Sequence, residues 1–224
     1  MLLSALLSTL LATVAVSEAS AATTTPRIKC SSTPLHSGQP FVFLGRYAGN
    51  FYVDLSIKAT DSAKRPALPI NRAFNFPMDG VVPQVDFYTC NSTYLGYKNG
   101  VQSGDDQLEI TDYYGQIRYN GKCVTLETLN STTAHPLVLD TCKTTEGASL
   151  LTQWFNYHVE SLFVYYGMPR DVTTSLNFVG KTAANKGAAG YMLTNRTLAG
   201  HEVVEYKYSS KGFSNPTGID LYVQ

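Results

Sequence analysis

The chain has few charged residues and no long helical pattern, and each shortage excludes a class of protein. Only 15% of its 224 residues are charged, and 17 basic side chains balance 17 acidic ones. Without a basic run there is no electrostatic footprint for nucleic acid, so we expect no nucleic-acid partner. Little of the chain has a 3.6-residue period, whereas 15 tyrosines and 10 phenylalanines favour strands.

Motifs for common enzyme chemistries are also missing. The chain contains no GxSxG, HExxH, GxxxxGK or GxGxxG motif. Its four histidines are scattered, and no single nucleophile stands out beside one of them. The adjacent carboxylates Asp105 and Asp106 lie in a glycine-flanked turn, a context more typical of solvated side chains than of a glycosidase pair. We therefore expect a protein that is not an enzyme and that needs no cofactor.

Four cysteines, an even number, indicate disulfides rather than a metal centre. Cys30, Cys90, Cys123 and Cys142 form no CxxC pair, and no histidine lies near them at zinc spacing. We expect no metal, and we interpret the cysteines as those of an exported protein. Spacing alone leaves their connectivity open.

The N-terminus has the features of a signal peptide. Residues 2–16 are almost wholly apolar or small, and Ala19-Ser20-Ala21 has the small-x-small pattern of a signal-peptidase site. Glu18 interrupts the apolar run too early for a typical membrane span. We expect residues 1–21 to be removed and the mature chain, 22–224, to be a secreted, extracellular single domain without a membrane span; an uncleaved anchor is the alternative.

Three N-glycosylation sequons agree with export. They begin at Asn91, Asn130 and Asn195, in turn-like contexts. A sequon is short and has little weight alone, but three of them behind a signal peptide predict a glycoprotein if the host is a eukaryote.

Short apolar runs alternate along the chain with clusters of Gly, Asn, Pro and Ser. Asn120-Gly121, between GQIRY and KCVTL, predicts a hairpin, because a type I′ turn needs positive φ at both central residues. Many short strands separated by turn signals favour an all-β barrel or sandwich. The predicted strands are 41–44, 51–57, 85–89, 107–111, 116–119, 123–127, 137–140, 153–158, 162–166, 176–179, 203–208 and 219–223.

Internal similarity indicates three degenerate units. TCNST (89–93) resembles TCKTT (141–145), and ITDYYG (110–115) resembles LFVYYG (162–167), both at an offset of 52 residues. One such unit could not bury its apolar face alone, so three units would share one core. The units are expected near 41–97, 107–158 and 162–208.

The first unit carries a longer connection than the second. RYAGNFYVDL (46–55) resembles RYNGKCVTL (118–126) with one extra residue, and the larger offset between them implies an insertion. Residues 58–80 are rich in proline and charge, and we interpret them as a long surface loop.

The middle unit, residues 115–155, contains GQIRYNGKCVTL, then HPLVLDTC and then SLLTQWF. In this order it resembles a subdomain of the ricin-B-type β-trefoil lectins. Gln153 abuts Trp154, whereas the family closes its unit with Q-x-W, so this motif is distorted; the likeness is faint in the other two units. The resemblance implies an all-β fold, a β-trefoil of three degenerate repeats, with a β-sandwich as the alternative. The matching residues are Gly115, Ile117, Arg118, Cys123, Val138, Leu139, Cys142 and Trp154.

The resemblance also carries structural expectations for the cysteines and the tryptophan. It implies that Cys123 pairs with Cys142 inside the unit, which leaves Cys30 and Cys90 to pair with each other. It further implies that Trp154 packs in the hydrophobic centre rather than serving as a ligand platform.

In lectins of this type an aspartate soon after the first cysteine position accepts hydrogen bonds from sugar hydroxyls, beside an aromatic ring. Carried over, this position falls on Asp54, on Thr125 and, through the match of CVTL with SLNF, on Asn177. Only Asp54 is a carboxylate; Asn177 would bind more weakly, and the Thr125 unit has lost its site. The resemblance thus implies one carbohydrate site at Asp54, with Asn50 or Tyr52; the alternative is that Asp54 is an ordinary exposed strand residue.

Together these features predict a secreted, non-catalytic, lectin-like protein that binds glycans or glycoproteins. One alternative is a β-trefoil protein-binding module such as a hydrolase inhibitor, which would contact a secreted partner through residues 58–80. Another is an extracellular structural or effector-like protein without a small ligand.

Overall fold

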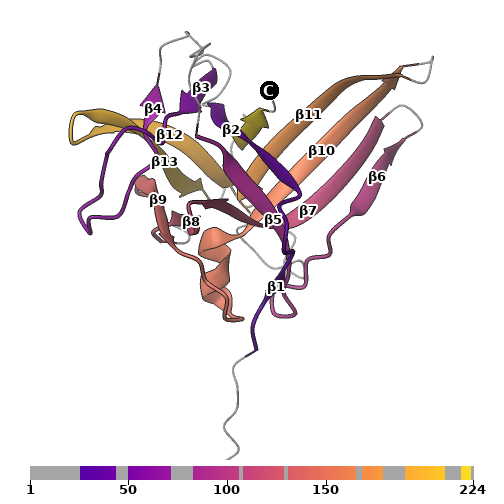
Figure 1. The fold of residues 1–224 in the computed structure, drawn as a ribbon, viewed down its shortest axis with the longest axis horizontal. Coiled ribbons are helices and arrows are strands. Elements are labelled where there is room, and N and C mark those ends of the chain that lie inside the picture. Colours follow the sequence, from indigo (N-terminus) through magenta and orange to yellow (C-terminus); the bar gives the residue numbers. More distant parts are fainter. Residues whose placement is uncertain are drawn as a thin grey trace, which may run out of the picture.

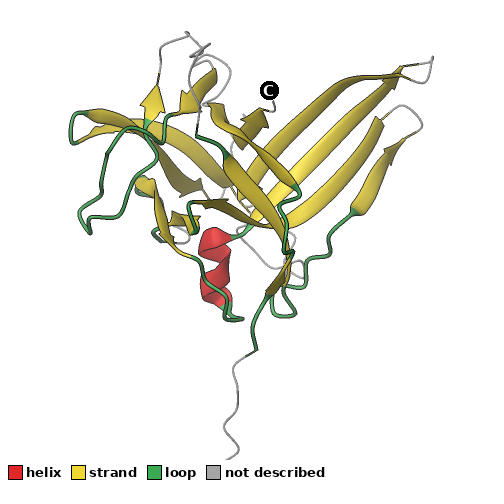
Figure 2. Cartoon of the chain, in the orientation of Figure 1, coloured by secondary structure: helices red, strands yellow, loops and turns green. Residues whose placement is uncertain are grey.

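The chain is mostly antiparallel β-structure, which confirms the predicted all-β class (Figure 2). A 3₁₀ helix, η1 (Ala148–Gln153), is the single helix of the described residues. The predicted signal peptide at 1–21 lies outside those residues. The computed structural model describes residues 26–43, 50–71, 83–105, 108–128, 131–164, 168–178, 190–209 and 218–222.

The strands are short except around the middle of the chain. In chain order they are β1 (Lys29–Cys30), β2 (His36–Phe43), β3 (Asn50–Val53), β4 (Ile70–Asn71), β5 (Val85–Asn91), β6 (Val101–Asp105), β7 (Leu108–Tyr119), β8 (Lys122–Leu126), β9 (His135–Thr141), β10 (Phe155–Val164), β11 (Met168–Phe178), β12 (Gly190–Leu198), β13 (His201–Ser209) and β14 (Gly218–Tyr222).

Six of these strands pair in a closed ring. β2 pairs with β5, β5 with β7, β7 with β10, β10 with β11, β11 with β14, and β14 returns to β2, all antiparallel. Closure leaves the ring without the unpaired strand edges of an open sheet. Figure 1 shows β7, β10 and β11 side by side on the right.

Three of the ring pairings, β2 with β5, β7 with β10 and β11 with β14, join strands that a further antiparallel pair separates in the chain. The first hairpin, β3–β4, lies in the chain between β2 and β5; the second, β8–β9, between β7 and β10; the third, β12–β13, between β11 and β14. The three hairpins touch one another: Ala67 bridges Val138, Pro69 bridges Val203, and Pro136 pairs with Glu205. Strand, hairpin, strand is thus the order of elements in all three parts of the chain.

The main core joins the ring to the hairpins. Phe87, Ile117 and Phe155 from ring strands pack in one cluster with Leu126 of the second hairpin and Tyr206 of the third. Their side chains are almost completely buried. Each hairpin therefore buries its apolar face on a core that it shares with the rest of the chain, which is the main stabilising term of such a fold.

A second core cluster contains the tryptophan and one of the two disulfides. Trp154 is fully buried with Leu95, Leu150 and Ile28, and Cys90 belongs to the same cluster. The expectation that Trp154 is a core residue is therefore confirmed. The disulfides are Cys30–Cys90 and Cys123–Cys142, as the resemblance implied.

Two predicted breaks between strands are wrong. Residues 107–111 and 116–119 were expected as separate strands, but the single strand β7 covers 108–119, because β6 and then β5 pair along one edge while β10 pairs along the other. The predicted strands 153–158 and 162–166 likewise meet in one strand, β10, which starts after η1 and contains 155–158 and 162–164. The hairpin at Asn120-Gly121 is confirmed, with φ of 48° and 74°.

The prediction of a long surface loop at 58–80 is wrong for its described part, 58–71. Ala59 and Ala67 are buried there, and the backbone N–H of Leu68 donates to the carbonyl of Leu137 in the second hairpin. Leu68 also accepts a hydrogen bond from Val204 of the third hairpin through its own carbonyl. This segment connects β3 to β4 and packs against the other two hairpins, although residues 58, 60 and 62–64 are exposed.

Candidate functional site

Asp54 directly follows β3 and anchors a turn. Its carboxylate Oδ1 accepts hydrogen bonds from the backbone N–H and the hydroxyl of Ser56, at 3.0 and 2.5 Å. Its carbonyl accepts the N–H of Ile57 at 3.1 Å, and its own N–H donates to the carbonyl of Pro69 at 3.0 Å. Such a self-bonded turn is a common use of aspartate and fixes the carboxylate in one orientation.

The second carboxylate oxygen of Asp54 meets an amide from the other strand of the first hairpin. The Nδ2 of Asn71 donates to Oδ2 of Asp54 at 3.2 Å. Both residues are half-buried. Asn71 was not among the predicted site residues, because the packed connection 58–69 separates it from Asp54 in the chain. The antiparallel pairing of β3 with β4 returns the chain to Asp54, and that pairing was not predicted.

The other predicted site residues lie on two different parts of the fold. Asn50 and Tyr52 belong to β3, where Tyr52 pairs with Asn71 across the first hairpin; their side chains lie outside the described part of the structure. Asn177 lies in the ring strand β11 opposite Asn156 of β10, and β11 does not pair with β3. The structure therefore brings Asn50 and Tyr52 to the neighbourhood of Asp54 but does not bring Asn177 there.

The place of Asn177 in the fold shows that the alignment of SLNF with CVTL, which selected this residue, was wrong. The 52-residue offset matched SLNF of β11 to CVTL of β8, although β11 is a ring strand and β8 belongs to a hairpin. A short apolar alternation is common to all strands of an antiparallel protein, so it aligned elements that have different places in the fold.

Thr125 faces the protein interior. It is 3% exposed, its hydroxyl donates to the carbonyl of Cys123 at 2.8 Å, and it accepts a 2.8 Å hydrogen bond from Nε2 of Gln153. The same Gln153 amide donates to the carbonyl of Thr141 at 2.9 Å and accepts the N–H of Lys143 at 2.7 Å. Gln153 thus joins the end of η1 to the second hairpin, and Thr125 is part of that structural network.

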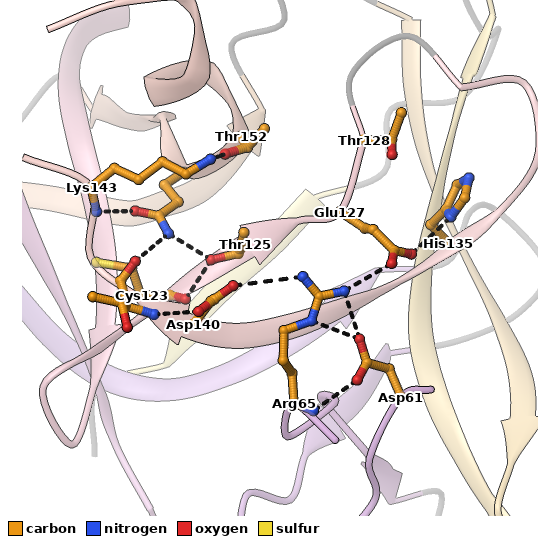
Figure 3. A network of polar contacts seen from close by, with 12 residues as sticks. Asp61, Arg65, Cys123, Thr125, Glu127, Thr128, His135, Asp140, Lys143 and Thr152 are labelled. Atoms are coloured by element: carbon orange, nitrogen blue, oxygen red, sulfur yellow. Dashed lines mark hydrogen bonds and ion pairs between the residues drawn. The ribbon is translucent and has the colours of Figure 1, made fainter. Parts of the chain in front are cut away.

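A cluster of charged residues joins the first two hairpins (Figure 3). The guanidinium of Arg65 contacts Asp61 at 2.7 Å, Glu127 at 2.8 Å and Asp140 at 3.6 Å. Partial burial alone would lower the pKa of Arg65, but the carboxylates of Asp61 and Glu127 raise it above its ordinary value. The cation is therefore engaged by carboxylates, and its role is to hold the 58–69 connection on the second hairpin.

The predicted glycosylation sites have different surroundings. Asn91 is exposed at the end of β5, where the chain turns. Asn195 is half-buried within β12, opposite Val204 of β13. Asn130 lies outside the described residues.

Within the part of the chain that the structure describes, no group of three or more His, Cys, Asp or Glu side chains could hold a metal ion. No helix of that part is long and apolar enough to cross a membrane. No family model, curated protein or solved structure matches the chain.

Proposed function

We propose that this protein is a β-trefoil that binds carbohydrate through a single site in its first hairpin. Support for the trefoil comes from the pairing order: a ring of six strands, with one hairpin inserted in each third of the chain. A β-sandwich would have two facing sheets, whereas the ring pairings continue through six strands without interruption.

The contact between Asp54 and Asn71 is the observation that carries the binding proposal. A neutral sugar offers hydroxyl groups and no charge, so its recognition needs fixed acceptors and donors that lie close together. The carboxylate of Asp54 accepts, the amide of Asn71 can both donate and accept, and the two groups touch at 3.2 Å. Asp54 is held by Ser56 before any ligand arrives, so little ordering cost remains for binding.

One site, rather than three, agrees with the chemistry of the other hairpins. In the second hairpin the hydroxyl of Thr125 is buried and already hydrogen-bonded to the amide of Gln153. In the third hairpin the buried Glu205 pairs with Arg196 at 2.7 Å. A monovalent protein binds a glycan but does not cross-link cells, because cross-linking requires at least two sites on one particle.

Export and glycosylation belong to the same proposal. Two disulfides persist best in an oxidising compartment, and Asn91 offers an exposed acceptor for a glycan. The partners would then be extracellular glycans or glycoproteins.

A glycan array, followed by titration of the best glycan, tests the site with a conservative variant. Asp54→Asn keeps the size of the side chain and one acceptor for the Ser56 turn but removes the charge. A hydrogen bond to a charged group contributes about 1.5–3 kcal/mol, so we expect affinity to fall about tenfold or more. Ser56→Ala removes one hydrogen bond that orients Asp54 but keeps the carboxylate, so it should lower affinity less than Asp54→Asn does.

Two results would contradict this proposal. If the disulfide-bonded protein binds no glycan on the array, carbohydrate binding is wrong. If Asp54→Asn and Asn71→Ala both bind as the parent does, the site is not in the first hairpin.

A protein-binding role through residues 58–80 finds less support. Inhibitory loops must project from their scaffold, whereas much of 58–71 is buried and its backbone bonds to the other two hairpins. Residues 72–80 lie outside the described residues.

A further inference from the structure

Away from Asp54, a serine and a glutamate from the connection between β8 and β9 lie on opposite sides of the histidine that begins β9. The hydroxyl of Ser131 lies 2.9 Å from Nε2 of His135. The other ring nitrogen, Nδ1, lies 3.0 Å from Oε2 of Glu127. A serine within hydrogen-bond reach of a histidine that a carboxylate orients is the geometry by which proteins activate a hydroxyl nucleophile.

The contact with Glu127 favours the tautomer of His135 that has its hydrogen on Nδ1 and leaves Nε2 free to act as a base. Glu127 accepts a 2.8 Å hydrogen bond from Arg65 through Oε1, while its other oxygen, Oε2, faces the imidazole. A carboxylate can only accept, so Nδ1 of His135 carries the hydrogen of that contact. In the neutral ring Nε2 then has the lone pair, and it can take a proton from Ser131.

The groups that face the His135 ring support a transient positive charge. Glu127 contacts the ring directly, and the buried Glu205 of β13 interacts with it electrostatically. The ring of Tyr206 lies beside it, with centroids 6.0 Å apart. Arg65 is a nearby cation, and its charge is offset by Asp61 and Asp140 as well as by Glu127. A second cation, Arg196, pairs with Glu205.

The serine is both held and accessible. Its oxygen accepts the N–H of Thr133 at 3.2 Å, and its hydrogen can go either to the carbonyl of Thr133 or to His135. Ser131 is half-buried, and the side chains of His135 and Glu127 are 27% and 34% exposed. A small reagent can therefore reach the hydroxyl while the local turn keeps it next to the imidazole.

We propose that Ser131 is an activated nucleophile that accepts acyl groups from activated esters, with His135 as its base and Glu127 as the residue that positions the base. The oxygen of Ser131 forms a bond to the acyl carbon, and the ester bond to the leaving alcohol breaks. The proton passes from Ser131 to Nε2 of His135 and then to the departing alcohol. Water cleaves the acyl-serine by the reverse proton path, which returns the hydroxyl and releases the acid.

The expected activity is modest. A positioned base contributes roughly 10²–10⁴-fold over an unassisted reaction, and the proposal requires only this contribution. It therefore applies to acyl donors with good leaving groups, such as aryl esters. It is independent of carbohydrate binding, since it uses none of the groups around Asp54.

Covalent labelling of the full, disulfide-bonded protein with an alkyl fluorophosphonate tests the proposal. Peptide mapping compares the labelling rate at Ser131 with that at Ser149, an exposed serine on η1. We expect Ser131 to react about 10²-fold faster or more. Ser131→Ala should remove the fast label and the hydrolysis of p-nitrophenyl acetate that accompanies it, whereas Ser149→Ala should leave both unchanged.

Variants of the base and its partner separate activation from simple exposure. We expect His135→Asn to slow labelling of Ser131 at least tenfold, and Glu127→Gln to slow it less, because an amide still accepts from Nδ1. Each variant is compared only while it melts cooperatively with both disulfides intact. Labelling of Ser131 no faster than that of Ser149 would overturn the proposal. So would fast labelling that His135→Asn and Glu127→Gln leave unchanged.

Discussion

The amide of Gln153 donates a 2.8 Å hydrogen bond to the hydroxyl of Thr125, and both side chains are buried. By resemblance, Thr125 stands where ricin-B-type lectins carry a sugar-binding aspartate. Its match in the first hairpin, Asp54, is half-buried and bonds to Ser56 and Asn71. Thr125 therefore serves the internal structure of the second hairpin, whereas the carboxylate of Asp54 is the group that we propose binds the sugar.

This contact predicts how substitutions of Thr125 behave. Thr125→Val leaves one amide hydrogen of Gln153 without its partner in a buried place and should lower the free energy of unfolding by about 1–2 kcal/mol. Thr125→Asp buries a carboxylate and should cost more than Thr125→Val while adding no glycan binding. Urea denaturation and the glycan array measure the two effects. A stable Thr125→Asp variant with a second binding site would contradict the assignment of Thr125 to the core.

Glu146 should make the free energy of unfolding depend on pH in the acidic range. It accepts hydrogen bonds from the hydroxyl of Ser92, from the hydroxyl and N–H of Thr93, and from the N–H of Tyr94. Partial burial alone would raise the pKa of Glu146, but these hydrogen bonds lower it below its ordinary value. The folded state thus binds fewer protons than the unfolded state. The stabilisation is fully present above the ordinary pKa of glutamate and is lost as pH falls through the folded-state pKa.

The variant Glu146→Gln tests this dependence. At neutral pH we expect it to lower the free energy of unfolding by roughly 1–2 kcal/mol, since charge-assisted hydrogen bonds become neutral and solvent screens part of the difference. Below about pH 4 the difference in free energy of unfolding between the variant and the parent should become smaller. Melting curves across this range measure it, and a gap that stays constant with pH would contradict the role of the ionised carboxylate.

Gly115 is required by the close approach of β7 to β5. A Cβ built on Gly115 would lie 1.9 Å from the carbonyl oxygen of Tyr88, which is backbone and cannot rotate away. We expect Gly115→Ala to cost roughly 3 kcal/mol or more. Gly121→Ala is the matched control: it has positive φ, 74°, but open space around its Cβ, so about 1 kcal/mol is expected. Urea titrations compare the two variants. Equal losses in free energy of unfolding would show that β5 and β7 move apart easily to make room for the methyl group.

The two disulfides should differ in how much they contribute to the free energy of unfolding. They join residues 19 and 60 positions apart, and loop closure predicts about 3 kcal/mol for Cys123–Cys142 and about 4 kcal/mol for Cys30–Cys90. The double variants Cys123→Ala/Cys142→Ala and Cys30→Ala/Cys90→Ala, compared by thermal melting, test the order. A larger loss for the shorter loop would mean that strain or packing, rather than chain entropy, dominates.

Local chemistry made several features predictable. Asn120-Gly121 forms its turn because few other residue pairs accept positive φ twice in succession. The resemblance in residues 115–155 correctly implied both disulfides and the burial of Trp154. For the proposed site it pointed to Asp54, a residue that the structure holds next to an amide.

Other expectations failed where several elements meet. Asn177 was assigned from an apolar alternation that β8 and β11 share, although only β8 belongs to a hairpin. The 58–71 segment looked like a surface loop because proline and charge are usual in loops, but Arg65 and Asp61 satisfy each other and the alanines pack inward. Asn71 was missed because the 58–69 connection separates it from Asp54 in the chain. The group around His135 was missed because a local turn, which no sequence motif marks, brings Ser131 and Glu127 to the ring.

The sequence by itself determined the all-β class, a central hairpin and the chemistry available to each segment, since alternation, turn residues and cysteines act over a few neighbours. Tertiary structure alone decided that Thr125 turns inward to Gln153, that Asn71 reaches Asp54, and that Ser131, His135 and Glu127 align beside Arg65. These relationships depend on which strands pair and on how closely they approach. Such pairings are set by the burial of a common core, a property of the whole chain that no local pattern contains.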